Sequence, residues 1–380
     1  MKFFLSSAAI LLLSVQQSLA AKTCAVKSSG GDDASNIVDA FNNCNNGGTV
    51  EFTKGTTYNL NSVVSVEKLQ DVTVNFEGTI NLPAYNTKFE DEKAFIYLAG
   101  DNIHFSGSGT INGNGQGWYD AKNRNAPPLF KPKATNSYFG GFKIVKAPRS
   151  HFSVNGCKNV VFEQININTV SDDEELDAHN TDAFDVSQSQ DIVIQDSTIV
   201  NGDDCIAVNR DVTNLTVSNL DCTGSHGFSV GSLGKKGDAQ TETVKDLKFI
   251  SNKCHNCQNG VRIKTWPGGK GSVSGITFED ITLDNVENPI IITTHYCDDQ
   301  QQEYCNGEDS HSLSISDVTI SGISGTASSE KNNPIVSIDC STETPCKDFT
   351  LSDITVKGHD GTKPNVCTNL EGSDKISYCN

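Results

Sequence analysis

The sequence predicts an all-β protein, a single-domain right-handed parallel β-helix with a short N-terminal capping helix. Short strands of alternating apolar residues recur at intervals of mostly 23 to 37 residues, a spacing typical of stacked coils in a solenoid. Only 20% of the 380 residues are charged, and Gly, Asn, Ser and Thr are abundant. That composition argues against a disordered chain and against a helical bundle. The formal net charge of -18 argues against binding to nucleic acid or to anionic membranes.

Most repeats open at a polar residue, followed at once by alternating apolar positions. Asn and Asp suit tight bends because their side chains bond to the local backbone and tolerate left-handed conformations. The interval between Asn102 and Asn159 is much longer than the others, so we expect one degenerate repeat between them. A β-sandwich is the alternative, although its turns would recur about every 8–12 residues. The opening residues are Asp71, Asn102, Asn159, Asp191, Asn214, Asp246, Gly275, Ser312 and Asp348.

The N-terminal region predicts a secretory signal peptide, followed by the capping helix. Met1 and Lys2 form a basic start, an apolar run follows, and small residues precede the expected cleavage after Ala20. Residues 1–20 would be removed, leaving residues 21–380 as one secreted, extracellular domain. Apolar positions over 37–41 predict a helix that covers the first coil and blocks edge pairing. No later run of about 18 apolar residues predicts a transmembrane helix.

Thirteen cysteines indicate an oxidising compartment. Cys254 and Cys257 form an isolated Cys-x-x-Cys without two further ligands at zinc spacing, so a disulfide or another non-metal role is favoured. The odd count leaves one cysteine over, which we expect to be Cys157, and the sequence leaves the connectivity open. The further disulfide candidates are Cys24 and Cys44, Cys205 and Cys222, Cys297 and Cys305, Cys340 and Cys346, and Cys367 and Cys379.

Four polar clusters mark a candidate site, and their spacing places them on successive coils. Asp182 and Asp203 are 21 residues apart, and Asp204 and His226 are 22 apart. Such separations match one coil, so these side chains should stack roughly 5 Å apart along one face. The last cluster lies further on because a loop over residues 234–242 intervenes. The clusters are Asn180-Thr181-Asp182, Gly202-Asp203-Asp204, Gly224-Ser225-His226-Gly227 and Arg262-Ile263-Lys264.

Three carboxylates, one imidazole and two cations in one groove have the chemistry for cleaving a glycosidic bond. Close carboxylates repel, so the pKa of one rises and it can act as an acid, while an ionised one activates water. Arg262 and Lys264 can hold a substrate carboxylate. Each cluster alone is most often an ordinary turn or strand face, and only the common spacing favours a site. Calcium binding by the aspartates is the rival, but the neighbouring cations oppose it, so we expect no metal and no cofactor.

At these clusters the sequence resembles the polygalacturonase family of pectin-degrading glycoside hydrolases, family 28. The motifs stand in the family's order and spacing, and the resemblance covers essentially the whole mature chain. It implies a pectin-lyase-like β-helix, in agreement with the repeat, and inverting hydrolysis of α-1,4-linked galacturonate. It also implies that Asp203 is the general acid. Asp182 and Asp204 would hold and deprotonate water, and His226 would tune the acid. The substrate-binding residues that it implies are Arg262, Lys264, Tyr296 and Asn180.

The motif around His226 favours an exo-acting enzyme that releases galacturonate from the non-reducing end. Many endo-acting members carry Gly-Gly-His-Gly, whereas this chain has Gly224-Ser225-His226-Gly227. The segments that follow His226 and Arg262 also look more like fungal exopolygalacturonases. Loops over 235–242 and 298–309 are candidates for closing one end of the cleft. Endo cleavage, a xylogalacturonan hydrolase, a calcium-dependent pectate lyase and a non-catalytic β-helix remain alternatives.

Three expectations concern partners and surface residues. The partners would be polygalacturonate and pectin oligosaccharides, without nucleic acid or membrane, and the protein would be a monomer. Asn214 begins an Asn-Leu-Thr acceptor sequence and is a glycosylation candidate, with an unmodified bend residue as the alternative. Trp266 beside Pro267 is more often a packing residue than a sugar platform.

Overall fold

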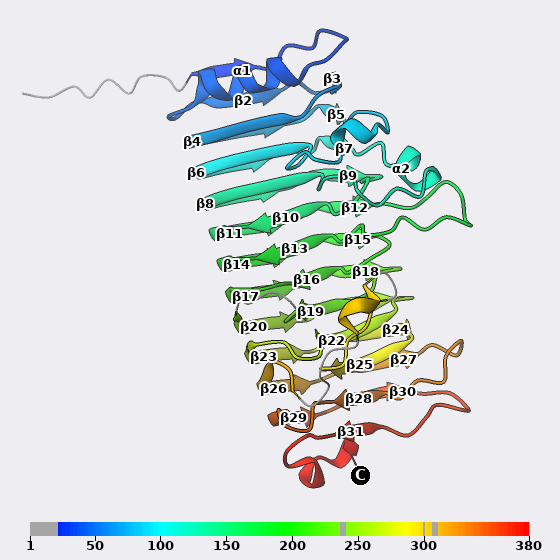
Figure 1. Cartoon of the computed structure of the whole chain (residues 1–380). Coiled ribbons are helices and arrows are strands. Elements are labelled where there is room, and N and C mark those ends of the chain that lie inside the picture. Colours follow the sequence, from blue (N-terminus) through cyan, green and yellow to red (C-terminus); the bar gives the residue numbers. More distant parts are fainter. Residues whose placement is uncertain (1–21, 236–240, 299–300, 306–310, 380) are drawn as a thin grey trace, which may run out of the picture.

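The computed structural model describes residues 22–235, 241–298, 301–305 and 311–379. It shows a tall stack of coils in which each strand pairs in parallel with the equivalent strands of neighbouring coils (Figure 1). Among the described residues helices are few and short. The prediction of an all-β parallel β-helix is confirmed.

The strands form two parallel sheets that run the length of the stack. The 11-stranded sheet consists of β3 (Thr57–Asn59), β5 (Thr79–Asn81), β7 (Thr110–Asn112), β9 (Lys143–Val145), β12 (Asn166–Asn168), β15 (Thr198–Val200), β18 (Asp221–Thr223), β21 (Lys253–His255), β24 (Thr282–Val286), β27 (Ser324–Ala327) and β30 (Thr355–Lys357).

The 20-stranded sheet bends within each coil, so that from β10 onward each coil contributes two strands to it. Its members are β1 (Thr23–Ala25), β2 (Thr49–Phe52), β4 (Val64–Phe76), β6 (Ile96–Ser106), β8 (Phe130–Gly140), β10 (Phe152–Asn155), β11 (Lys158–Glu163), β13 (Phe184–Ser187), β14 (Gln190–Gln195), β16 (Ile206–Val208), β17 (Val212–Ser218), β19 (Phe228–Leu233), β20 (Glu242–Ile250), β22 (Asn259–Thr265), β23 (Gly271–Glu279), β25 (Asn288–Thr293), β26 (Ser314–Ser321), β28 (Val336–Asp339), β29 (Lys347–Ser352) and β31 (Val366–Thr368).

The residues that open the repeats form the bends of the coils. Eight of the nine predicted residues have a positive φ, such as 54° at Asn159, and Asn136 with φ 49° supplies the bend of the expected degenerate repeat. Ser312 was the wrong choice for its coil, where Asp317 with φ 54° takes that position. Neighbouring bends are also bonded: Asn159 Nδ2 donates to Asn136 Oδ1 at 2.8 Å. Polar ladders therefore run along the corner of the stack.

The N-terminal end is covered by α1 (Ala34–Cys44), at the top of Figure 1. Its buried face includes Ile37 and Phe41, and a disulfide joins Cys44 to Cys24 of β1. The predicted capping helix is confirmed, because this apolar face closes the open end of the core. The predicted signal peptide, residues 1–20, lies outside the described residues and stays a prediction. No described helix has the length and apolar character needed to cross a membrane.

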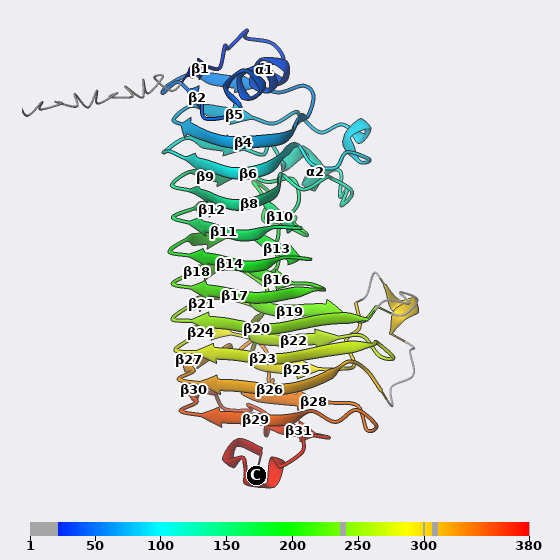
Figure 2. The ribbon, with the colours of Figure 1, turned by 90° about the vertical axis from the view of Figure 1, so that its left-hand side faces the viewer.

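Short helical segments project from the stack on the side of β13, β16 and β19 (Figure 2). Toward the N-terminal end these are η1 (Thr87–Phe89) and α2 (Gln116–Asp120), and toward the C-terminal end η2 (Gln302–Tyr304). The C-terminal tail adds η3 (Ser373–Lys375) and η4 (Ser377–Cys379). The polar clusters lie on this face, between the projecting segments.

Candidate active site

Successive coils bring the four predicted clusters together. The inward residues Phe184, Ile206, Phe228 and Val261 pair in register from β13 through β16 and β19 to β22. The first three clusters lie in the turns before β13, β16 and β19, and the fourth lies within β22. The spacing argument is therefore correct, because one coil separates each neighbouring pair of clusters.

All eight residues predicted for catalysis or substrate binding line one groove with a volume of about 460 Å³. In its centre, one carboxylate oxygen each of Asp182, Asp203 and Asp204 lies within 4.8 Å of the others. The eight residues are Asn180, Asp182, Asp203, Asp204, His226, Arg262, Lys264 and Tyr296.

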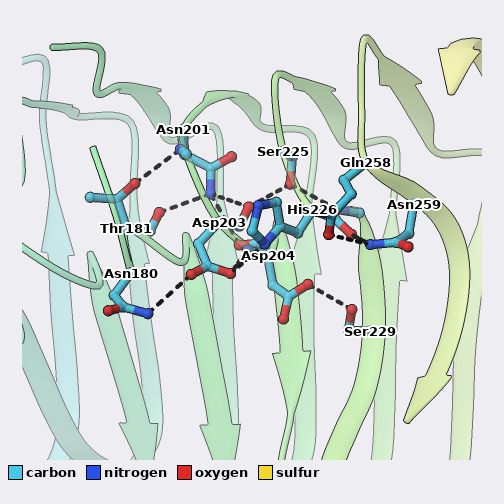
Figure 3. Close-up of polar contacts among 12 residues, drawn as sticks. Asn180, Thr181, Asn201, Asp203, Asp204, Ser225, His226, Ser229, Gln258 and Asn259 are labelled. Carbon is cyan, nitrogen blue, oxygen red and sulfur yellow. Dashed lines mark hydrogen bonds and ion pairs between the residues drawn. The ribbon is translucent and has the colours of Figure 1, made fainter. Parts of the chain in front are cut away.

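Asp203 and His226 form the pair at the mouth of this cluster (Figure 3). His226 Nδ1 lies 3.0 Å from Asp203 Oδ1, and Asn180 Nδ2 donates to Asp203 Oδ2 at 3.2 Å. Burial opposes ionisation of Asp203, but the hydrogen bond and charge of His226, with Lys264, lower its pKa to about 2. Burial likewise opposes the imidazolium, yet Asp203 and Asp204 raise the pKa of His226. Both shifts favour a proton on His226 beside an ionised Asp203.

Asp204 is held more deeply, with its side chain only 2% exposed. Ser229 Oγ donates to Oδ1 at 2.6 Å, and Lys264 Nζ donates to Oδ2 at 2.7 Å. Arg262 Nη1 lies 4.0 Å from Oδ1. Both carboxylate oxygens of Asp204 therefore accept a hydrogen bond.

Asp182 and Asp185 are the carboxyl groups whose pKa values the site raises. Burial, followed by the charges of Asp185, Asp203 and Asp204, raises the pKa of Asp182 well above its ordinary range. Burial also raises the pKa of Asp185 to about 6, against the hydrogen bond from Ser150. Asp185 lines the groove, although it was missed from the sequence. Its outward position between buried residues of β13 was the signal that could have found it.

The turns that present the carboxylates are tied together by backbone-directed bonds (Figure 3). Asn201 Nδ2 donates to the carbonyl oxygens of Thr181, Asp203 and Asp204 at 2.8–3.1 Å. Ser225 Oγ donates to the carbonyl of Asp203 at 2.8 Å. Ser225, which stands where many endo-acting polygalacturonases have glycine, therefore stabilises the turn that carries Asp203, the expected general acid.

Gly227 is required where the chain passes its neighbour. Its φ is 95°, and a Cβ there would lie 2.0 Å from the carbonyl oxygen of Asn259. Asn259 Nδ2 in turn donates to the carbonyl of His226 at 2.9 Å (Figure 3). The close approach of these coils therefore fixes the backbone that carries the imidazole.

A buried histidine supports Asp182 from behind and was also missed. His151 Nδ1 lies 2.9 Å from the carbonyl oxygen of Asp182, so this nitrogen must carry the proton. Thr169 Oγ1 lies 2.7 Å from Nε2 and accepts from the Ala147 amide at 3.1 Å, so it donates to Nε2. Burial lowers the pKa of His151 to about 4. The neutral ring thus anchors the peptide of the first carboxylate.

Tyr296 lines the groove beside its two cations. The Arg262 guanidinium carbon and Lys264 Nζ lie 5.5 Å and 5.4 Å from the centre of its ring. Trp266 packs edge-on against the same ring at 4.8 Å and is 1% exposed. The buried indole therefore supports Tyr296 instead of offering a platform to a sugar.

The structure joins the cysteines as neighbours along the chain. Cys254 and Cys257 form a disulfide, and Cys157 is the free, buried cysteine. The other five disulfides join the five predicted neighbouring pairs.

Asn214 lies on an exposed bend, away from the groove, where its side-chain amide donates a hydrogen bond to Asp191 at 2.7 Å. Glycosylation of Asn214 stays a prediction.

Three clustered aspartates also raise the question of a metal ion. The Lys264 ammonium already bonds to Asp204, and Arg262 and the imidazole of His226 add further positive charge nearby. Divalent cations favour oxygen cages without such neighbours. The donor set therefore suits a carboxylated ligand better than a calcium ion.

Comparisons with known proteins agree with this site. The family model for glycosyl hydrolases family 28 matches residues 44–378. An exopolygalacturonase of Rhizopus delemar is 46% identical over 98% of this chain and 97% of its own length. One of Cochliobolus carbonum is 34% identical over 94% of this chain and 86% of its own.

Solved structures show the same fold. The endo-xylogalacturonan hydrolase of Aspergillus tubingensis superposes with a TM-score of 0.80 at 28% identity, covering 92% of this chain and 96% of its own. The polygalacturonase of Erwinia carotovora has a TM-score of 0.69 at 22% identity, covering 95% and 99%. With the family model spanning almost all of the described chain, this protein belongs to glycosyl hydrolases family 28.

Proposed function

We propose that this glycoside hydrolase is a secreted, exo-acting polygalacturonase that releases galacturonate from the non-reducing end of polygalacturonate with inversion. The hydrolysis rests on one observation, the stack of Asp182, Asp203 and Asp204 beside a pair of cations in a single groove. The exo mode is supported by the names of the similar fungal enzymes.

In this proposal the Asp203–His226 pair supplies the proton. The raised pKa of His226 and the lowered pKa of Asp203 favour the proton on His226 in the free site, 3.0 Å from Asp203. A bound sugar excludes water from the pair, which disfavours the two charged groups relative to the two neutral ones and so favours transfer of the proton from His226 to Asp203. Asp203 then protonates the glycosidic oxygen as the bond from that oxygen to the anomeric carbon breaks. Asn180 holds the second oxygen of Asp203 during the transfer.

Water attacks the anomeric carbon and gives a proton to Asp204, with Asp182 orienting it. The nearest oxygens of the three carboxylates lie within 4.8 Å of one another, so the groups are close enough for retention to be considered as well as inversion. A retaining enzyme, however, needs a free, ionised carboxylate oxygen as nucleophile. Each oxygen of Asp204 already accepts one hydrogen bond, which weakens it as a nucleophile but leaves a lone pair for a proton from water. The raised pKa of Asp182 disfavours its ionised form. Inversion is therefore the outcome that we propose.

Arg262 and Lys264 hold the carboxylate of the sugar next to the cleaved bond, with Tyr296 beside it. The exo mode also needs a barrier at one end of the groove. The disulfide Cys297–Cys305 ties the segment that carries η2, and Cys297 and Asp298 line the groove. The candidate closing loops over 235–242 and 298–309 lie partly outside the described residues.

Xylogalacturonan is the second candidate substrate. Its support is the likeness to the Aspergillus tubingensis endo-xylogalacturonan hydrolase, at a TM-score of 0.80 and 28% identity. That activity would require room for xylose branches in the same groove. It is distinguished by digesting xylogalacturonan and unbranched polygalacturonate in parallel.

The test is digestion of unesterified polygalacturonate, with product size and viscosity followed together and Asp203→Asn as the inactive control. We expect free galacturonate as the early product and a slow fall in viscosity. Early mixed oligomers with a rapid fall in viscosity would show internal cleavage. Proton NMR of the first product should show the β anomer, and an α anomer would mean retention.

A further inference from the structure

A second pair of basic residues lies on the same outward strip of the sheet as Arg262 and Lys264. In β8, Lys131 and Lys133 alternate with the buried residues Phe130, Pro132 and Ala134, so both side chains point outward. The spacing of the pair repeats that of Arg262 and Lys264 in β22.

The register places the two pairs in line. The buried residue before Lys131 is Phe130, which pairs with Phe152 of the next coil. The same register continues from coil to coil until it reaches Val261, the buried residue before Arg262. The residue after each of these lies on the opposite side of the strand, so Lys131 and Arg262 belong to one row along the stack. Five strand spacings separate them, about 24 Å. The catalytic groove does not include Lys131 or Lys133, so this is a separate surface.

The lysine pair has no counter-ion among the described residues. Neither Lys131 nor Lys133 forms an ion pair or hydrogen bond there, and Lys131 is half-buried. Lys93 lies close by, with its ammonium 3.5 Å from the ring centre of Tyr97, the strand neighbour of Lys131. Burial, then the charges of Lys93 and Lys133, lower the pKa of Lys131. An anion would relieve this repulsion.

We propose that Lys131 and Lys133 bind carboxylates of a polygalacturonate chain, as a second uronate site outside the catalytic groove. This rests on the proposed function, since the polymer is the substrate. A polyuronate carries one carboxylate on each sugar, and two lysines whose Cα atoms lie about 7 Å apart along a strand can contact neighbouring or alternate sugars. The site retains the polymer near the groove and leaves the cleavage of short substrates unaffected.

The experiment measures binding to the inactive Asp203→Asn protein by calorimetry at low salt. Adding Lys131→Gln and Lys133→Gln should weaken binding of long polygalacturonate about three- to tenfold, as expected for two partly exposed ion pairs. Digalacturonate should bind with unchanged affinity. The matched control is Lys245→Gln with Lys248→Gln, an exposed pair of β20 that changes the net charge equally.

Three results would overturn the proposal. They are unchanged polymer binding, an equal loss in the control pair, or the same loss with fully methyl-esterified pectin, which lacks the carboxylates. The outcome does not depend on the proposed activity, because only binding to an inactive protein is measured. Failure of the activity would appear separately, as no galacturonate released by the wild type.

Discussion

Asp185 shows how one residue links the groove to the stability of the fold. It lies beside the catalytic cluster, and burial raises its pKa to about 6 from an ordinary 3.8. Between these two pH values the folded protein holds a proton that the unfolded chain has lost. Stability therefore falls as the pH rises through this window, because ionising Asp185 in the fold is unfavourable.

Asp185→Asn should increase the free energy of unfolding by about 3 kcal/mol at pH 7 and change it little below pH 4. The amide stays neutral at both pH values and can still accept the hydrogen bond from Ser150. Urea unfolding at pH 3.5 and pH 7 measures the difference. Asp39→Asn, at an exposed position of α1, is the control. A gain of equal size at both pH values would mean that ionisation of Asp185 is not the cause.

At the scale of the element, the bend residues set the shape of each coil and bond it to the next coil. Asn159 combines a φ of 54° with a side-chain bond of 2.8 Å to Asn136 in the preceding coil. A left-handed conformation costs a residue with a Cβ about 1–2 kcal/mol, and glycine escapes this cost.

Asn159→Ala should therefore lower the free energy of unfolding more than Asn159→Gly does, by about 1 kcal/mol. Both substitutions lose the bond to Asn136, so their difference isolates the backbone. Denaturant midpoints of the two variants and the wild type give the values. Equal destabilisation by Ala and Gly would show that the ladder bond matters and the left-handed bend does not.

At the scale of the whole molecule, the charge distribution predicts independence from metal ions. The protein is acidic overall, with a formal net charge of -18, yet cations converge on its aspartate cluster. The Lys264 ammonium lies 2.7 Å from Asp204. This side chain therefore places a positive charge where a bound calcium ion would otherwise supply one.

EDTA should leave both the hydrolytic rate and the melting temperature unchanged. The measurement compares protein dialysed against EDTA with protein to which calcium has been added back. A loss of activity that calcium restores would instead point to lyase chemistry, and unsaturated products absorbing in the ultraviolet would accompany it.

Much of the architecture could be predicted because a solenoid turns sequence spacing into spatial distance. Residues one coil apart along the chain, such as Asp182 and Asp203, lie close together in the fold. The number of residues between the polar clusters was therefore enough to predict that they line one groove. Ser312 was misplaced because its neighbours alternate like those of a true bend, whereas the real bend, Asp317, lies five residues on. Local pattern alone cannot separate these two, since only the register between coils selects one of them.

The sequence by itself determined the coil repeat, the capping helix and the clusters that meet, because each depends on local pattern and on spacing along the chain. Tertiary structure alone decided that the pKa of Asp203 is lowered and that of His226 raised, while the pKa values of Asp182 and Asp185 are raised. It also decided that His151 supports Asp182 from the core. These properties arise from burial and from charges on other coils, and no local stretch of sequence contains them.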